Sequence, residues 1–224
     1  MKVLEVKNLS ISFGDMPVIS QLSFSIDSGD FLCIVGENGS GKSTLLKAIT
    51  GEIKYKGKID FVGIEQKQIG YISQKSKIDE KFPATAEEIV ASGSLNAPTF
   101  GFCYSRTIRE RVSKSLKALS IEKLAKRSFS ELSGGQKQKV LLARALMATD
   151  KLIILDEPSN NLDQKSRTEL YKNLEKLNSE GMTVIMVTHD LDHGNLIGNK
   201  ILSLSKNMPF FGTTQEYVER IHHD

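Results

Sequence analysis

Short apolar stretches with the pattern of strands occupy the first third of the chain. Residues 2–8 and 22–26 alternate between apolar and polar positions, whereas residues 31–35 are apolar throughout. A continuous apolar run of this length is typical of a strand buried on both faces, so we expect it at the centre of a sheet. The other elements predicted here are a helix over 42–50, a hairpin at 55–59 and a strand at 69–72.

The pattern changes to helical in the middle of the chain, over residues 75–149. Pro83, Pro98 and Gly101 interrupt this part, and the candidate helices cover 84–92, 106–119 and 136–148. From residue 150 strands and helices alternate again. Strands are predicted at 152–155, 183–188 and about 201–204, with helices at about 164–178 and at the end of the chain.

These patterns together predict an α/β fold. Buried strands separated by helices indicate a mostly parallel central sheet covered on both faces, and the first strands add an N-terminal antiparallel β portion. We expect a single domain over 1–224, in which 1–74 and 150–224 form the core. Residues 75–149 form a helical lobe inserted into that core.

Composition narrows the class of protein. The chain has 224 residues, enough for one core, and its net charge of +3 is too weak to indicate a nucleic-acid partner. No apolar run reaches the roughly 18 residues of a membrane span, and the first residues lack the pattern of a signal peptide. We therefore expect a cytosolic chain, in which Cys33 and Cys103 are packing thiols that form no disulfide.

A glycine-rich turn follows the central strand. Residues 36–43 fit G-x-x-x-x-G-K-[ST] between a buried strand and a helix, which is the setting of a phosphate-binding loop. Backbone amides would wrap the polyphosphate, Lys42 would reach its terminal phosphates, and Ser43 would bind magnesium. This predicts a P-loop NTPase whose nucleotide-binding residues are Gly36, Glu37, Asn38, Gly39, Ser40, Gly41, Lys42, Ser43 and Thr44.

Two adjacent acids end a second apolar strand. Asp156 and Glu157 follow residues 152–155, so they should lie at the carboxyl edge of the sheet beside the phosphate loop. Alternation sends the two side chains in different directions. Asp156 is then expected to hold magnesium and Glu157 to face the attacking water.

A second anion-binding motif opens the helix near residue 136. Ser133 offers an N-cap hydroxyl, and Gly134 and Gly135 leave backbone amides free at a helix N-terminus. A serine and two glycines are also common in ordinary helix starts. Taken alone, the segment therefore remains open between a plain helix cap and a phosphate contact.

The three motifs, in this order and spacing, resemble the ATP-binding-cassette (ABC) family over nearly the whole chain. The resemblance implies ATP and Mg²⁺ as ligands and a head-to-tail homodimer with two ATP molecules between the subunits. In such a dimer Ser133, Gly134, Gly135 and Gln136 complete the partner's ATP site. Further matches are the adenine-stacking Phe13, the catalytic and magnesium-sensing Gln74, the interface loop 159–163 with Asp163, and the catalytic switch histidine His189.

The match departs from the commonest family pattern at two places. Ser73 stands where many relatives have proline, and residues 159–161 read Ser-Asn-Asn where threonine often leads. Neither change removes a group that catalysis needs, so these departures bear on coupling and not on ATP binding.

Histidines and surface charges offer other readings. His189 and His193 have a spacing that suits a metal on a helix, but a strand delivers His189 to the edge that carries Glu157, which favours phosphate sensing. His193, His222 and His223 are expected to be solvated. The basic residues of the lobe leave open a solvated face or a contact with an anionic membrane leaflet; they are Arg106, Arg109, Arg111, Lys114, Lys117, Lys123, Lys126 and Arg127.

The resemblance favours the energising subunit of a transporter. A single cassette with a compact lobe implies a separate membrane permease, with the chain attached peripherally to the inner face of the cell membrane. Residues 74–93 resemble those of bacterial importers of zinc, manganese or iron, which also use an external solute-binding protein. In this resemblance Ile78, Phe82 and Ile89 are candidate permease contacts, although a place in the lobe core explains them equally well.

Three alternatives are weighed against this interpretation. The catalytic motifs fit an exporter subunit equally well, because fold and motifs determine the chemistry and leave the task open. A soluble cassette acting in translation or DNA repair is a second alternative, disfavoured by the lack of a basic arm. A P-loop kinase is a third, and residues 132–136 together with the lack of a substrate signal argue against it.

Overall fold

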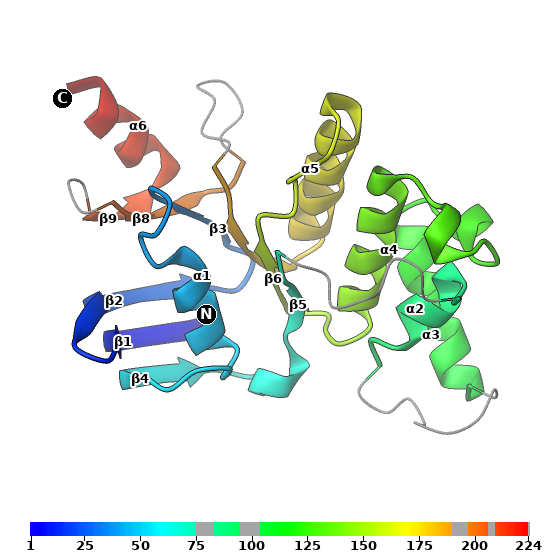
Figure 1. Cartoon of the computed structure of the whole chain (residues 1–224), viewed down its shortest axis with the longest axis horizontal. Helices are drawn as coiled ribbons and strands as arrows, with labels where there is room; N and C mark the ends of the chain where they lie inside the picture. The colour runs from blue at the N-terminus through cyan, green and yellow to red at the C-terminus, as the bar shows by residue number, and fades with distance from the viewer. Residues whose placement is uncertain (75–82, 95–103, 190–196, 206–208, 224) are drawn as a thin grey trace.

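We describe a computed structural model of the chain, which covers residues 1–74, 83–94, 104–189, 197–205 and 209–223, without the side chains of His222 and His223. Figure 1 shows a sheet region that contains both termini and a group of helices on the opposite side.

The N-terminal part forms a three-stranded antiparallel sheet with the order β2-β1-β4. Its strands are β1 Lys2–Phe13, β2 Met16–Asp27 and β4 Lys56–Phe61. The register between β1 and β2 shifts at several points, and each shift moves side chains from one face to the other. This explains why the alternating pattern marks only 2–8 and 22–26 of two strands that are each 12 residues long.

The hairpin predicted at 55–59 is wrong. Lys56–Phe61 runs as one strand and pairs antiparallel with β1, from Leu4 opposite Phe61 to Ser10 opposite Lys56. Gly57 suggested a tight turn, but its backbone (φ +102°) passes so close to β1 that an added Cβ would lie 2.5 Å from the Asn8 carbonyl oxygen. The glycine therefore marks a close approach of two strands.

The central sheet has six strands in the order β5-β6-β7-β3-β8-β9. They are β5 Gly70–Ile72, β6 Leu152–Asp156, β7 Thr183–Val187, β3 Phe31–Val35, β8 Lys200–Leu204 and β9 Pro209–Thr213. All pairs are parallel except β8 with β9. The prediction that 31–35 lies at the sheet centre is confirmed, because β3 is buried throughout and pairs with β7 and β8.

The helices fall into two groups (Figure 1). Three helices lie beside the sheets: α1 Lys42–Ile49, α5 Gln164–Ser179 and α6 Thr214–His223. The helices α2 Ala86–Ala91, α3 Arg106–Ala118 and α4 Gly134–Leu146 pack on one another. Short 3₁₀ turns cover Gln66–Gln68, Glu122–Leu124 and Phe129–Glu131.

The central sheet separates two hydrophobic cores. Phe31, Cys33 and Val35 point into the core shared with α2 to α5, whereas Leu32 and Ile34 point into the core shared with α1 and the antiparallel sheet. This alternation along β3 follows from the two-residue period of a strand, and it explains why β3 carries no polar residue.

Of the three candidate permease contacts, the structure describes only Ile89. Ile89 is buried at 4% exposure in the core of the helices, so its side chain is a core residue. Ile78 and Phe82 lie outside the described residues.

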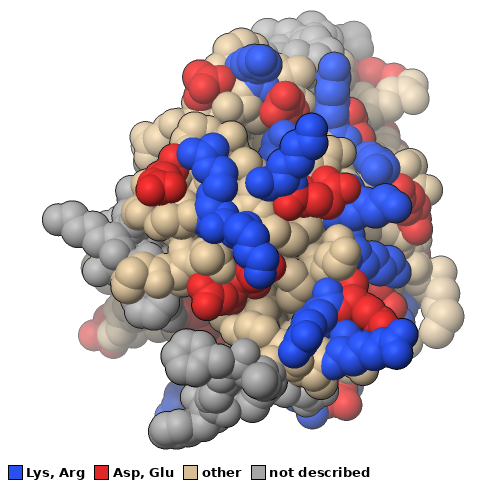
Figure 2. Space-filling view, turned by 90° about the vertical axis from the view of Figure 1, so that its right-hand side faces the viewer, with Lys and Arg blue, Asp and Glu red and all other residues tan. Residues whose placement is uncertain are grey.

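The outer face of the helical side carries charges of both signs. Figure 2 shows Lys and Arg side chains interspersed with Asp and Glu over this face. Arg106 pairs with Glu110 at 2.8 Å, and Lys126 pairs with Glu87 at 2.5 Å. This arrangement favours a solvated face over a uniformly basic surface for a membrane leaflet.

Candidate functional site

The predicted phosphate loop joins β3 to α1. Gly36, Gly39 and Gly41 have φ of +145°, +81° and +98°, values that side chains rarely allow. The loop thereby turns back on itself and ends at the N-terminus of α1, whose N-cap Gly41 supplies no side-chain hydrogen bond. The first-turn amides of α1 therefore lack a side-chain cap, which suits an anion at this point.

Lys42 and Ser40 show that the loop encloses polar groups. Lys42 is 5% exposed, and its Nζ donates to the carbonyl oxygens of Gly36 at 2.8 Å and Glu37 at 2.9 Å. Burial lowers the pKa of Lys42, against the opposing charges of Glu157 and Asp156. The Ser40 hydroxyl is buried and has no hydrogen-bond partner within the described part of the chain. A phosphate fits a loop that carries a buried ammonium, an unpaired hydroxyl and uncapped amides.

Ser43, in the first turn of α1, contacts Asp156 at the end of β6. The Ser43 hydroxyl donates to Asp156 Oδ1 at 3.2 Å, although 113 residues separate them in the chain. Asp156 is 3% exposed, and burial raises its pKa while the Ser43 hydrogen bond opposes the rise. A hydroxyl and a carboxylate beside a phosphate loop are the oxygen ligands that magnesium takes in such sites.

The Glu157 carboxylate contacts three polar side chains, none of which is the Ser43 that contacts Asp156. Gln74 Nε2 donates to Oε2 at 2.7 Å, Asn160 Nδ2 donates to Oε2 at 2.5 Å, and His189 Nε2 lies 2.6 Å from Oε1. Burial opposes ionisation of Glu157, but the hydrogen bonds from His189 and Asn160 outweigh it and hold the pKa below its ordinary value. Glu157 is therefore an ionised carboxylate with both oxygens engaged.

This cluster draws on the carboxyl ends of three neighbouring strands. Gln74 follows β5, Glu157 follows β6 and His189 follows β7, and these strands are adjacent in the sheet. The sequence predicted that these three residues converge, and the structure brings them into hydrogen-bonding contact. The sequence placed Asn160 only in the interface loop 159–163 and did not predict its contact with Glu157. An amide three residues after the acid was the available signal, since this spacing allows a side chain to reach back over a turn.

In the segment 133–136, Ser133 and Gln136 form hydrogen bonds with each other. The Ser133 hydroxyl accepts from the Gln136 amide at 3.4 Å, and Gln136 Oε1 accepts from the Ser133 amide at 3.1 Å. This capping box satisfies two backbone donors at the start of α4. Gly135 faces α5 so closely that an added Cβ would clash with the Ser166 side chain, whereas at Gly134 the nearest atom would be Leu162 Cδ2 at 3.9 Å.

Two further expected residues lie at element ends. Phe13 ends β1 with 58% of its surface exposed, so its ring is free to stack on a planar group. Asp163 is the N-cap of α5, where its Oδ1 accepts from the Ser166 amide at 2.8 Å. That backbone hydrogen bond is the main cause of the lowered pKa of Asp163.

Of the remaining cysteine and histidine predictions, the structure tests the one for Cys33. Cys33 is buried, burial raises its pKa to about 12, and its Sγ donates to the Ile197 carbonyl oxygen at 2.8 Å, as expected of a packing thiol. Cys103 and His193 lie outside the described residues, as do the side chains of His222 and His223. Across the described ranges there is no cluster of three or more metal-binding side chains and no helix able to span a membrane.

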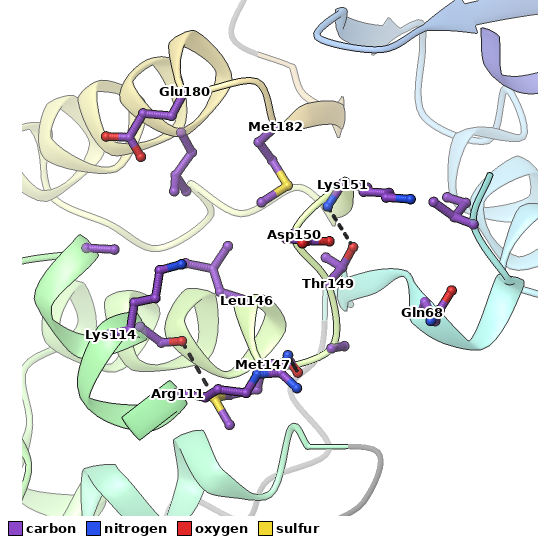
Figure 3. Close-up of a pocket in the computed structure, with 15 residues that line it drawn as sticks. Gln68, Arg111, Lys114, Leu146, Met147, Thr149, Asp150, Lys151, Glu180 and Met182 are labelled. Atoms are coloured by element: carbon purple, nitrogen blue, oxygen red, sulfur yellow. Dashed lines mark hydrogen bonds between the residues drawn. The ribbon is translucent and has the colours of Figure 1, made fainter. Parts of the chain in front are cut away.

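A hollow of about 720 Å³ lies at the opposite edge of the sheet (Figure 3). Its walls come from α3 with Arg111 and Lys114, from the segment 146–151 that leads into β6, and from Glu180 and Met182 before β7. Arg111 donates to the Met147 carbonyl oxygen at 2.7 Å and so ties α3 to the end of α4. None of the residues predicted to bind nucleotide lines this hollow, so it is separate from the site built around Glu157.

Comparison with known proteins decides the family. The profile described as "ABC transporter" matches residues 19–160, more than half of the chain. The chain belongs to the ABC transporter family. It is therefore an ABC ATPase with the P-loop fold of that family, in which a mostly parallel sheet is joined to an antiparallel N-terminal sheet.

Relatives of this ABC ATPase cover almost its full length. It is 37% identical to the zinc uptake system ATP-binding protein ZurA of Listeria innocua, over 96% of this chain and 88% of the relative. It is 34% identical to the manganese transport system ATP-binding protein MntB of Halalkalibacterium halodurans, over 94% and 86%. A solved metal-chelate-type ABC transporter in an inward-facing conformation matches 100% of this chain and 90% of its own with a TM-score of 0.83 and 33% identity.

Proposed function

We propose that this chain is the ATP-hydrolysing subunit of an importer of metal ions, with zinc, manganese or iron as cargo. Membership of the ABC transporter family supports the assignment as an ATP-hydrolysing subunit. The zinc and manganese systems among the relatives support metal ions as the cargo. The observation that carries the catalytic part is the contact of Gln74, Glu157 and His189 beside Lys42 and Asp156.

ATP binding is assigned to residues 36–44 and Phe13. The uncapped amides of α1 and the Lys42 ammonium would hold the phosphates, and the exposed Phe13 ring would stack on adenine. Ser43, Asp156 and Gln74 would hold magnesium, which when bound neutralises charge on the phosphates. The hydrogen bond from Ser43 to Asp156 already places two of these three side chains together.

Hydrolysis is assigned to the group around Glu157. Its lowered pKa keeps the carboxylate ionised and ready to accept a proton from the attacking water. His189 and Gln74 reach the two different oxygens of that carboxylate, so they would orient both the base and the water. The attack would take place at the carboxyl edge of the sheet, where these side chains meet.

Two copies of the chain would complete two ATP sites. Residues 133–136 of one subunit would face the phosphates bound to the other, with Asp163 at the interface. The division into a core of 1–74 and 150–224 and a lobe of 75–149 would let the lobe bring this segment to the partner. Membrane permease subunits would bind the dimer at the inner face of the membrane, an external solute-binding protein would deliver the cargo, and no nucleic acid is involved.

Reconstitution tests the proposed function. The chain is purified from its native cell with the membrane protein that accompanies it, and the assembly is placed in proteoliposomes containing ATP. We expect Zn²⁺, Mn²⁺ or Fe²⁺ with the matching solute receptor to stimulate phosphate release and enter the ATP-containing lumen. Transport in the opposite direction would assign an exporter. Binding to ribosomes or DNA without any membrane partner would replace the proposal with a soluble cassette.

A further inference from the structure

Asn160 contacts the Glu157 carboxylate but has no role in the function proposed above. Its Nδ2 donates to Oε2 at 2.5 Å, on the same oxygen that accepts from Gln74. A hydrogen bond to an ionised carboxylate is stronger than one between neutral groups. Asn160 is exposed, and within the described residues this hydrogen bond is the principal contact of its side chain.

The loop after β6 is shaped so that Asn160 reaches back to Glu157. Glu157 and Asn161 both have left-handed backbones, with φ of +51° and +63°. The backbone amide of Asn160 donates to the Glu157 carbonyl oxygen at 3.3 Å and closes a tight turn from Glu157 to Asn160. A left-handed backbone is unfavourable for glutamate and persists only where surrounding contacts enforce it. The turn thus holds the backbone of Glu157 in a conformation that Glu would rarely adopt alone.

Contacts with α5 hold this turn in place. Pro158 and Ser159 are buried, and the Tyr171 hydroxyl on α5 donates to Ser159 Oγ at 3.1 Å. Gln74 and His189 reach Glu157 from other strands, whereas Asn160 belongs to the same short loop. The contact between Asn160 and Glu157 therefore does not depend on where the segments after β5 and β7 lie.

We propose that Asn160 is a positioning residue for ATP hydrolysis: it holds Oε2 of Glu157 and so orients the carboxylate for the attacking water. This inference rests on the proposed role of Glu157 as the base. Asn160 acts through Glu157, with which its side chain is hydrogen-bonded. Its loss should lower kcat and leave KM for ATP and the stability of the fold unchanged.

Two substitutions separate a hydrogen-bond role from a role of shape. Asn160→Ala removes the donor, and Asn160→Asp keeps the shape but sets a like charge beside Glu157. Steady-state phosphate release by the dimer should give a kcat about tenfold lower for Asn160→Ala, the effect of losing one charge-assisted hydrogen bond. Asn160→Asp should lose more activity than Asn160→Ala. The KM for ATP and the thermal midpoint should match the wild type in both.

A double-mutant cycle completes the test. In a Glu157→Gln background, measured by single-turnover hydrolysis, Asn160→Ala should cause no further loss, because the carboxylate it orients is gone. An equal loss in both backgrounds would overturn the inference, as would unchanged kcat in both Asn160 variants or a raised KM with normal kcat. Wild-type hydrolysis by Glu157→Gln alone would instead overturn the proposed function.

Discussion

The group around Glu157 and the segment 133–136 differ in how their polar atoms find partners. Around Glu157, side chains from β5, β6 and β7 and their loops meet, so the cluster exists only because the whole sheet has formed. At 133–136, Ser133 and Gln136 bond to each other within one helical turn. The first region is assembled by long-range contacts, and the second would look the same in any helix that begins with a capping box.

This difference teaches where each region should show its function. Damage to the Glu157 group should alter what one chain does with ATP. Damage to 133–136 should leave the chain's own ATP affinity intact and appear only when two chains act together. The following substitutions test this division, from the largest expected effect to the smallest.

Glu157→Gln should lower the hydrolysis rate by about 10²- to 10⁴-fold, the usual contribution of a general base. The amide cannot accept the proton from water, but it preserves the shape, so ATP should still bind. We expect an ATP-bound dimer to accumulate, visible by size-exclusion chromatography with ATP and Mg²⁺. Glu180→Gln, beside the hollow at the opposite edge of the sheet, is the matched control and should hydrolyse ATP normally. A wild-type rate in Glu157→Gln would contradict the role of this carboxylate.

Lys42→Ala should weaken ATP binding by about ten- to a hundredfold, because a charge-assisted contact to the phosphates is lost. Isothermal titration calorimetry of a monomeric preparation measures this directly. Lys47→Ala is a suitable comparison, since Lys47 is an exposed lysine on the same helix. Equal affinities for the wild type and Lys42→Ala would argue against the phosphate-loop assignment.

Gly134 and Gly135 are adjacent, yet they should respond differently to alanine. Gly135→Ala should cost about 1–3 kcal/mol of stability, because its Cβ would force α4 away from Ser166 on α5. Gly134→Ala has room and should keep its stability within about 0.5 kcal/mol. Chemical denaturation measures both changes.

The same pair also tests the partner's site. If Gly134 lies against the partner's phosphates, the added Cβ should hold them away from a backbone amide. Gly134→Ala should then lower hydrolysis by about tenfold without changing ATP affinity in the monomer. Normal hydrolysis by this stable variant would contradict the assignment of residues 133–136 to the partner's ATP site.

Sequence patterns located the elements that depend on local physics. The buried strand 31–35 and the helix from Lys42 follow from an apolar run and a glycine-rich turn, and both are present. The strand Pro209–Thr213 was not predicted, because it opens with proline, contains Gly212 and is defined by its pairing with β8. The local sequence could not predict which strand pairs with Lys56–Phe61 either, since its partner β1 lies about 50 residues earlier in the chain.

The site shows the same limit. Motif spacing brought Gln74, Glu157 and His189 to one sheet edge, which follows from parallel strands ending together. The hydrogen bond from Asn160 depends on two left-handed residues in one turn, and neither Glu157 nor Asn161 signals that backbone by type alone as a glycine would. Motif spacing thus predicted two of the three side chains that reach the carboxylate, Gln74 and His189, and loop conformation decided the third, Asn160.

Ser133 offers the finest test of the comparison. Ser133→Ala removes the N-cap hydroxyl of α4 and should cost about 1 kcal/mol of stability. Ser133→Asn restores a good cap, since asparagine accepts the same amide hydrogen bond. If Ser133 serves only the helix, Asn should restore stability and hydrolysis together. We expect it to restore the denaturation midpoint but not the hydrolysis rate of the dimer, because the larger amide would not fit against a partner's phosphates as the hydroxyl does.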